Sequence, residues 1–196
     1  MNIEDGKGSG RRAEVGTGYR LHTHAVTTTG TVNAAIKSLA YNLNTGTITL
    51  TNAVDTPVIY FKNNEDIPFV VTSMAVGIGE SDGTAAEEVP ITVVRNPTVG
   101  TIITSTPTNV AINQNRNFGS NRTLTADVYK GATGDTMTDG NDVLYLFASQ
   151  NARLFAGIDM ILPKGTSIGV KIDPPASNTG MAVYVALIGY LDDDLE

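Results

Sequence analysis

The sequence lacks cysteine and tryptophan, and it contains only two histidines among its 196 residues. Without cysteine the chain cannot form a disulfide bond, a thiolate metal site or a cysteine nucleophile. Aromatic residues make up only 6% of the chain, which leaves little ring surface for the sugar platform of a glycosidase. The acidic pairs of the chain lie in polar segments, where carboxylates are usually just solvated. We therefore predict that the protein is not an enzyme and needs no cofactor.

Long apolar runs are also missing. No run of 18 apolar residues occurs, so we expect no membrane-spanning helix, and the first ten residues lack the apolar region of a secretory signal. Basic residues number 13 against 20 acidic ones, for a net charge of -7. Because nucleic-acid binding usually requires a concentrated basic surface, neither a membrane nor a nucleic acid is an expected partner.

Abundant glycine, threonine, valine and asparagine favour strands and turns over helices. With 41% hydrophobic residues, the chain can bury a substantial core. Strand-like segments recur about every ten residues, and none has a convincing amphipathic helical pattern. We therefore predict an all-β fold, an antiparallel β-sandwich that is jelly-roll-like.

The expected strands follow from β-branched and alternating residues bounded by turn signals. Residues 32–39 fit either a short helix or a strand, and we favour a strand. Residues 108–122 are rich in asparagine and predict a long loop. The remaining expected strands lie within residues 44–52, 56–66, 67–79, 89–97, 99–107, 123–131, 142–149, 152–162, 166–172 and 181–192.

The first 28 residues differ from the rest of the chain. They hold both histidines, several glycines and four of the 13 basic residues, but few apolar residues. We predict an extended N-terminal arm at 1–28 and a β-sandwich domain at 29–196. Arginines can form bidentate hydrogen bonds to carboxylates across an interface, and a few apolar residues can fix the arm on a partner without folding it alone. The residues expected to make these contacts are Arg11, Arg12, Val15, Arg20, Leu21 and Val26.

Two features of the arm suggest small-ligand sites. Gly8, Gly10 and Ala13 match the spacing of a dinucleotide-binding fingerprint, but neither a hydrophobic strand before them nor a helix after them is expected. His22 and His24 would point to one face of a strand, where two imidazoles can ligate Zn²⁺ or Ni²⁺. No third ligand is close in sequence, so the alternative is a pair of exposed or interface histidines.

A third candidate ligand site lies near the acidic residues Asp135, Asp139 and Asp142. Their spacing faintly resembles a calcium-binding loop, but no glutamate stands at the distance that an EF-hand requires. An Asp-Gly turn at Asp139 explains the same residues without an ion. We therefore assign no metal site to this segment.

The opening segment IEDGKGSGRRAEVGTGYRLHTHAVT resembles the start of many virion proteins of tailed bacteriophages. Residues 115–131 and 162–175 also resemble such structural proteins. The resemblance implies a head decoration, cement, head-fibre or tail-associated protein, and it carries over no catalytic residues. The matching positions of the opening segment are Ile3, Asp5, Gly6, Gly8, Gly10, Ala13, Val15, Arg20, Leu21, Ala25, Val26 and Thr27.

The resemblance and the absent active site lead to one functional hypothesis. We expect a non-enzymatic capsid decoration or cement protein, located in the virion, that forms a homotrimer and binds the major capsid protein or another virion protein through its arm. The alternative is the receptor- or carbohydrate-binding head of a phage fibre or tail-associated protein. Loops 80–88, 108–122 and 131–142 would then carry the site, with Tyr129 or Tyr145 stacking on a sugar.

Overall fold

The computed structural model describes residues 29–51, 53–81, 88–104, 114–176 and 178–193, and the backbone alone of three short strands. Two of these strands, β1 (Ile3–Glu4) and β2 (Arg12–Ala13), pair with each other in antiparallel fashion. The rest of the predicted arm, residues 1–28, lies outside the described residues. The arm therefore stays a prediction, and the fold below is that of the sandwich.

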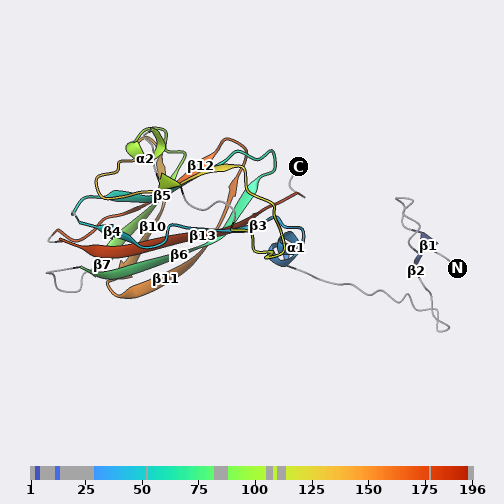
Figure 1. The fold of residues 1–196 in the computed structure, drawn as a ribbon, viewed down its shortest axis with the longest axis horizontal. Helices are drawn as coiled ribbons and strands as arrows, with labels where there is room; N and C mark the ends of the chain where they lie inside the picture. The colour runs from blue at the N-terminus through green and yellow to red at the C-terminus, as the bar shows by residue number, and fades with distance from the viewer. Residues whose placement is uncertain are drawn as a thin grey trace.

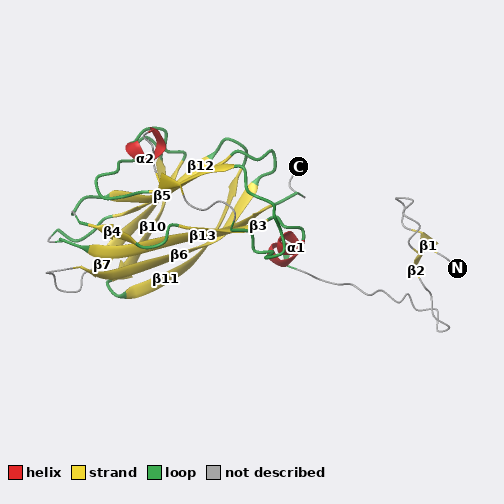
Figure 2. Ribbon diagram, viewed as in Figure 1, coloured by secondary structure: helices red, strands yellow, loops and turns green. Residues whose placement is uncertain are grey.

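Two antiparallel sheets pack face to face (Figures 1 and 2). The first sheet has the order β11-β6-β13-β3, and β4 also pairs with β13 beside β3. The second sheet has the order β10-β7-β12-β5-β9-β8, in which β8 is only two residues long. The strands are β3 (Ala40–Asn44), β4 (Ile48–Leu50), β5 (Thr56–Asn63), β6 (Phe69–Ser81), β7 (Glu88–Arg95), β8 (Thr108–Asn109), β9 (Ala126–Lys130), β10 (Asn141–Ser149), β11 (Ala152–Leu162), β12 (Ser167–Ile172) and β13 (Met181–Leu191).

The strand order confirms the predicted jelly-roll-like sandwich. The eight main strands in chain order are β3, β5, β6, β7, β10, β11, β12 and β13. Numbered one to eight in that order, they pair as 1-8-3-6 in the first sheet and 2-7-4-5 in the second. This is the arrangement of a double-sheet jelly roll, in which the first strand lies beside the last. The shorter strands β4, β8 and β9 extend the sheets beside β3 and β5.

Alternating residues of both sheets build the core. In β13, Met181, Val183, Val185 and Leu187 are buried, while the residues between them are exposed or half-buried. This alternation follows from the two-residue period of a strand, which sends successive side chains to opposite faces. The inner faces meet in close contacts, such as the edge-to-face pair of Phe61 and Phe69 with ring centroids 4.8 Å apart.

A second, smaller core covers part of the outer face of the second sheet. Helix α2 (Thr101–Thr104) and the loop after β9 lie over this face (Figure 1), where Ile102 and Met137 pack on outward residues of the sheet. A Cβ added to Gly169 would lie only 2.3 Å from Met137 Sδ. Glycine at this position therefore lets the methionine approach the sheet. The double covering explains why β5 is buried on both faces along most of its length.

The strand that we favoured at residues 32–39 is wrong. Residues Gly30–Ile36 form the helix α1, and the Thr29 side chain caps it by accepting a hydrogen bond from Val32 N at 3.3 Å. A threonine at the N-cap followed by two consecutive alanines favours a helix. The buried Ala34 anchors α1 on the end of the sandwich.

The strand predicted at residues 99–107 is also wrong. Ile102 and Ile103 lie in α2, and the amide of Thr104 donates to the Gly100 carbonyl at 3.1 Å. The β-branched residues here favour a strand locally, but burial of Ile102 in the second core overrides that preference. Within the described part of the chain, neither short helix is long and apolar enough to cross a membrane.

Candidate interaction surface

One side of the sandwich is closed by the chain itself. Residues 114–125, here called the strap, run from the free edge of β3 in the first sheet to β9 in the second. Along β3, the amide of Asn42 donates to the Gln114 carbonyl at 3.0 Å, and the amide of Arg116 donates to the Ala40 carbonyl at 2.9 Å. The strap therefore takes the place of a further strand and satisfies this edge of the sheet.

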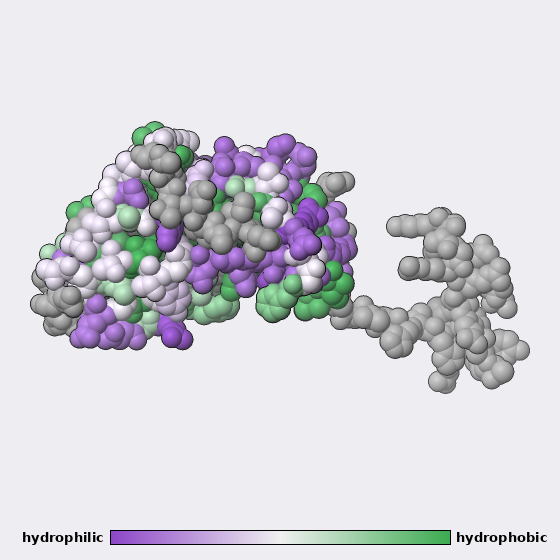
Figure 3. Space-filling view, in the orientation of Figure 1, coloured by the Kyte–Doolittle hydropathy of each residue, from purple (hydrophilic) through white to green (hydrophobic). Residues whose placement is uncertain are grey.

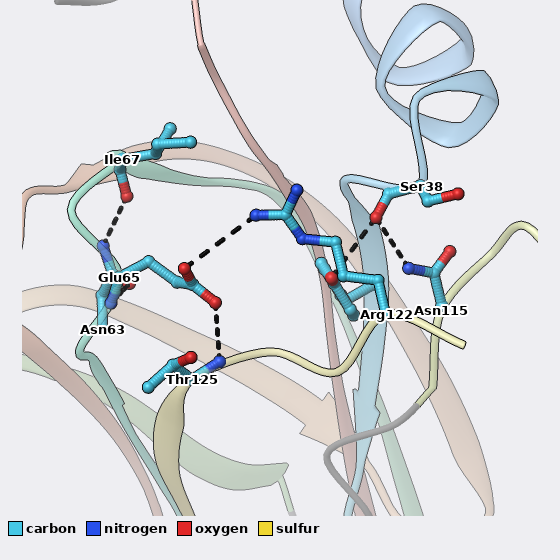
Figure 4. Close-up of polar contacts among 8 residues, drawn as sticks. Ser38, Asn63, Glu65, Ile67, Asn115, Arg122 and Thr125 are labelled. Carbon is cyan, nitrogen blue, oxygen red and sulfur yellow. Dashed lines mark hydrogen bonds and ion pairs between the residues drawn. The ribbon is translucent and has the colours of Figure 1, made fainter. Parts of the chain in front are cut away.

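Polar side chains hold both ends of the strap (Figure 4). At one end, Asn115 Nδ2 donates to the Ser38 carbonyl at 2.8 Å, and the hydroxyl of buried Tyr41 donates to the same oxygen at 3.3 Å. Burial raises the pKa of Tyr41. At the other end, the Thr125 amide donates to Glu65 Oε1 at 2.7 Å, and Arg122 lies 4.0 Å from the second carboxylate oxygen.

A buried asparagine supports the residues that grip the strap. Asn63 is fully buried. Its side-chain nitrogen Nδ2 donates hydrogen bonds to the Ile67 and Leu162 carbonyls at 3.0 and 2.9 Å. Its side-chain oxygen accepts a hydrogen bond from the Glu65 amide at 3.0 Å. Asn63 therefore joins β5 to the end of β11 and fixes the loop that carries Glu65 (Figure 4).

The opposite side of the sandwich is open. Strand β10 ends the second sheet there, β11 ends the first, and the two-residue turn Gln150–Asn151 joins them. Among the residues that the structure describes, none pairs with the outer edge of either strand. One edge of each sheet is thus unpaired on this side of the molecule, which we call the open side.

Large apolar side chains are concentrated on the open side. Of the ten that are exposed among the described residues, five lie on β10 and β11. They form two groups, because outward side chains of two packed sheets point in opposite directions. The β10 flank consists of Val143, Tyr145 and Phe147, and the β11 flank consists of Phe155 and Ile161.

The gap between β10 and β11, where the core reaches the open side, is also lined by apolar side chains. Inward residues of both strands pack against the core but remain only half-buried, because no further strand covers them. They are Leu144, Leu146, Leu154, Ile158 and Met160. At the end away from the turn, a cleft of about 460 Å³ opens between Val143 of β10 and Ile161 of β11. Such a continuous apolar surface is typical of a contact with another protein.

A few charged groups border the open side. Tyr145 donates a hydrogen bond to the Asp142 carboxylate, and this bond raises the pKa of Tyr145. Glu88 lies opposite Ser149 on the outer face of β7, one strand in from the β10 flank. Arg153 lies on the outer face of β11. Neither Glu88 nor Arg153 forms an ion pair with any residue that the structure describes.

A smaller apolar patch lies at α1. Val32 and Ile36 are exposed there, and Figure 3 shows hydrophobic residues gathered at this end of the sandwich. The patch directly follows the predicted arm in the sequence. It therefore lies where residues 1–28 join the sandwich.

The residues predicted from sequence for the arm and for a metal are mostly outside the described part. Of the six arm residues, the structure describes only the backbone of Arg12, in β2. Arg11, Val15, Arg20, Leu21 and Val26 lie outside the described residues, as do His22 and His24. No cluster of three or more possible metal ligands occurs among the residues that are described.

The side chain of Asp135 in the 131–142 loop has structural partners. The Asp135 carboxylate accepts hydrogen bonds from Thr101 Oγ1 at 2.8 Å and from the Ala132 amide at 2.7 Å. These bonds tie the loop to α2 over the second core. They account for an aspartate at this position without an ion.

The two tyrosines suggested as sugar platforms differ in position. Tyr129 stacks on Tyr60 with ring centroids 6.1 Å apart and packs against the second core. Tyr145 is 59% exposed on the β10 flank. Of the loops suggested for the same site, 82–87 lies outside the described residues, and 114–122 belongs to the strap.

Sequence reasoning missed the open side itself. Its strands were predicted, but their free edges were not, because local sequence does not tell an edge strand from a central one. One signal was present: both VLYLFA (143–148) and RLFAGIDMIL (153–162) place apolar residues on both strand faces. In an edge strand that pattern leaves apolar residues exposed.

No protein-family model matches the chain, and no curated protein has a sequence that matches it.

Proposed function

We propose that this protein is a non-enzymatic structural component of a tailed-bacteriophage virion, a capsid decoration or cement protein. The observation that carries the proposal is the apolar open side of a jelly-roll sandwich whose opposite side is closed by its own chain. A surface of this kind favours assembly with other protein subunits. The resemblance of residues 3–27, 115–131 and 162–175 to virion proteins supports the same function.

The proposed mechanism is non-covalent cementing. The sandwich is a rigid body, and the arm at 1–28 contacts the major capsid protein or another virion protein. Arg11, Arg12 and Arg20 form charge-assisted hydrogen bonds with acidic groups of that partner, while Val15, Leu21 and Val26 bury apolar area. When copies are joined, several weak arm contacts act together and the particle holds the assembly tightly.

Binding to phage heads tests the proposal. Purified full-length protein is mixed with undecorated heads of the phage that encodes it, and bound copies are counted after sedimentation. We expect the triple variant R11A/R12A/R20A to bind at least about tenfold more weakly, because each lost charge-assisted bond contributes roughly 1.5–3 kcal/mol. The matched control is H22A/H24A in the same arm, which should bind normally. Full occupancy by the triple variant would overturn the arm's role.

One observation favours a second candidate, a receptor- or carbohydrate-binding head. Tyr145 presents an exposed ring whose orientation is fixed by its hydrogen bond to Asp142. Aromatic rings held in this way can stack on sugars. A glycan array with the full-length chain distinguishes the two functions: binding that is lost in Tyr145→Ala, with no binding to heads, would favour the second.

A further inference from the structure

We propose that the open side is where copies of this chain meet, with the β10 flank of one copy packed against the β11 flank of the next in a closed ring. The inference rests on the proposed function and deepens it by naming the partner of this surface, a second copy. Five features of the described residues support it: the directions of the flanks, the heights of their residues, the space at Gly157, their charges and their bulges.

The directions of the flanks give each copy two neighbours. Tyr145 and Phe147 point away from the second sheet, while Phe155 and Ile161 point away from the first. The flanks border one cleft at Val143 and Ile161 and diverge from it, so they are inclined to each other and one neighbour does not cover both. Each copy therefore needs two neighbours. Unlike contacts of this kind give a ring of at least three copies when the rotation between neighbours closes, and an open filament when it does not.

The heights of the residues along the strands match between the flanks. Rotation about an axis parallel to β10 and β11 leaves the height of every residue unchanged. We take the height of a residue as its distance along the strands from the turn Gln150–Asn151. Phe147 on β10 and Phe155 on β11 differ in height by about one residue, roughly 3.3 Å. Tyr145 and Gly157 differ by the same amount. In such a ring, Phe147 meets Phe155 of the next copy, and Tyr145 meets Gly157.

The Gly157 site has room for a ring. A Cβ added to this glycine would meet no atom closer than the Thr72 carbonyl oxygen at 4.0 Å. The surface above Gly157 is therefore open, next to Phe155, which is 68% exposed. A tyrosine ring from a neighbouring copy can pack on this open glycine surface beside an aromatic residue.

Charge is complementary at the same end of the strands. Glu88 lies level with Ser149, just before the turn, and Arg153 lies just after it. The ring brings Glu88 of one copy to the height of Arg153 of the next, so that opposite charges face each other. The contact would give a partner to two side chains that form no ion pair within the described residues.

The β-bulges on β10 and β11 favour a contact through side chains over pairing of backbone groups. The register shifts between Asp142 and Leu144 on β10, and between Gly157 and Met160 on β11. Bulges interrupt the regular row of backbone groups that a further strand would pair with. The copies therefore meet through side chains rather than by extending one continuous sheet.

The solution mass of the full-length protein tests the inference. We expect light scattering to give three or more times the 20.6 kDa of one chain. Tyr145→Asp on the β10 flank and Phe155→Asp on the β11 flank should each lower the fraction in the ring at least tenfold. The matched control is Phe118→Asp, because Phe118 is fully exposed but lies on the strap. Thermal unfolding checks that each variant is folded.

Two outcomes would overturn the inference: a wild-type mass of one or two copies, or a folded flank variant that keeps the ring. The head-binding assay separates this failure from failure of the proposed function. Single copies that still bind heads would refute the ring alone. A ring that never binds heads would refute the cement function and leave the contact between copies standing.

Discussion

The closed side and the open side of the sandwich treat their edge strands differently. Every sheet ends in strands with unpaired backbone groups, and a folded protein must cover those edges or protect them. At β3 the strap supplies backbone partners and a network of polar side chains around Glu65 and Asn115. At β10 and β11 the described chain supplies none, and five large apolar side chains are exposed there. The closed side thus serves folding, whereas the open side is available for assembly.

If the closed side is part of the folding core, its most buried polar residue should matter most. We expect Asn63→Ala to lower the free energy of unfolding by about 3 kcal/mol, because it removes three hydrogen bonds and leaves buried groups unpaired. Urea denaturation of the full-length protein measures the change. The control is Asn42→Ala, since Asn42 is exposed on the first sheet. Equal effects of the two substitutions would contradict the role given to Asn63.

A smaller effect is expected where Glu65 holds the strap. Glu65→Ala should cost about 1–2 kcal/mol, because the Thr125 amide loses its acceptor. Glu65→Gln should cost less, since its amide oxygen can still accept that bond, and the 4.0 Å contact with Arg122 is half-exposed and weak. Urea denaturation and hydrogen exchange at the Thr125 amide measure both effects. If Gln were as harmful as Ala, the ion pair rather than the hydrogen bond would hold the strap.

The sequence was sufficient to predict what depends on local pattern. Alternating or continuous apolar runs correctly located β5, β6, β10, β11 and β13, and their spacing indicated the sandwich. The pattern failed at α2, where Ile102 and Ile103 have strand propensity but pack in the second core. Residues 32–39 fitted either a helix or a strand, and their local propensity could not decide between the two. Packing on the sandwich decided for the helix.

The open side could not be predicted for a different reason. Whether Phe155 is buried or exposed depends on which strand lies beside β11, and that is decided by pairings between distant segments. Strand β6 covers one edge of β11, and in the described chain nothing covers the other. The strap was equally hidden, because an asparagine-rich sequence indicates a loop but not the edge that the loop covers.

A mixing experiment sharpens the contrast on the open side. Tyr145→Asp keeps an intact β11 flank, and Phe155→Asp keeps an intact β10 flank. Equal amounts of the two variants should therefore form one good contact and give a species of two copies, although neither variant assembles alone. Its affinity should be lower than that of the ring, because closure adds a second contact to each copy. Light scattering over a concentration series measures it. Assembly beyond two copies would show that other surfaces take part.

The smallest expected effect is electrostatic and lies on the closed side. Lys37, just after α1, donates hydrogen bonds to both carboxylate oxygens of Asp193 at 3.0 and 2.9 Å. This hydrogen bond lowers the pKa of Asp193 from its ordinary value near 3.8. A carboxyl group whose pKa is lower in the folded state stabilises the fold above its ordinary pKa, and that contribution is lost as the pH falls through the lowered value.

The pair should therefore give a stability difference that depends on both pH and salt. Between about pH 7 and pH 4, wild type should be slightly more stable than Asp193→Asn, and the gap should close as the pH falls further. Both side chains are 40% exposed, so high salt should also close it. Thermal unfolding at several pH values measures the gap. A gap that stays constant at low pH would mean that Asp193 acts by packing rather than by charge.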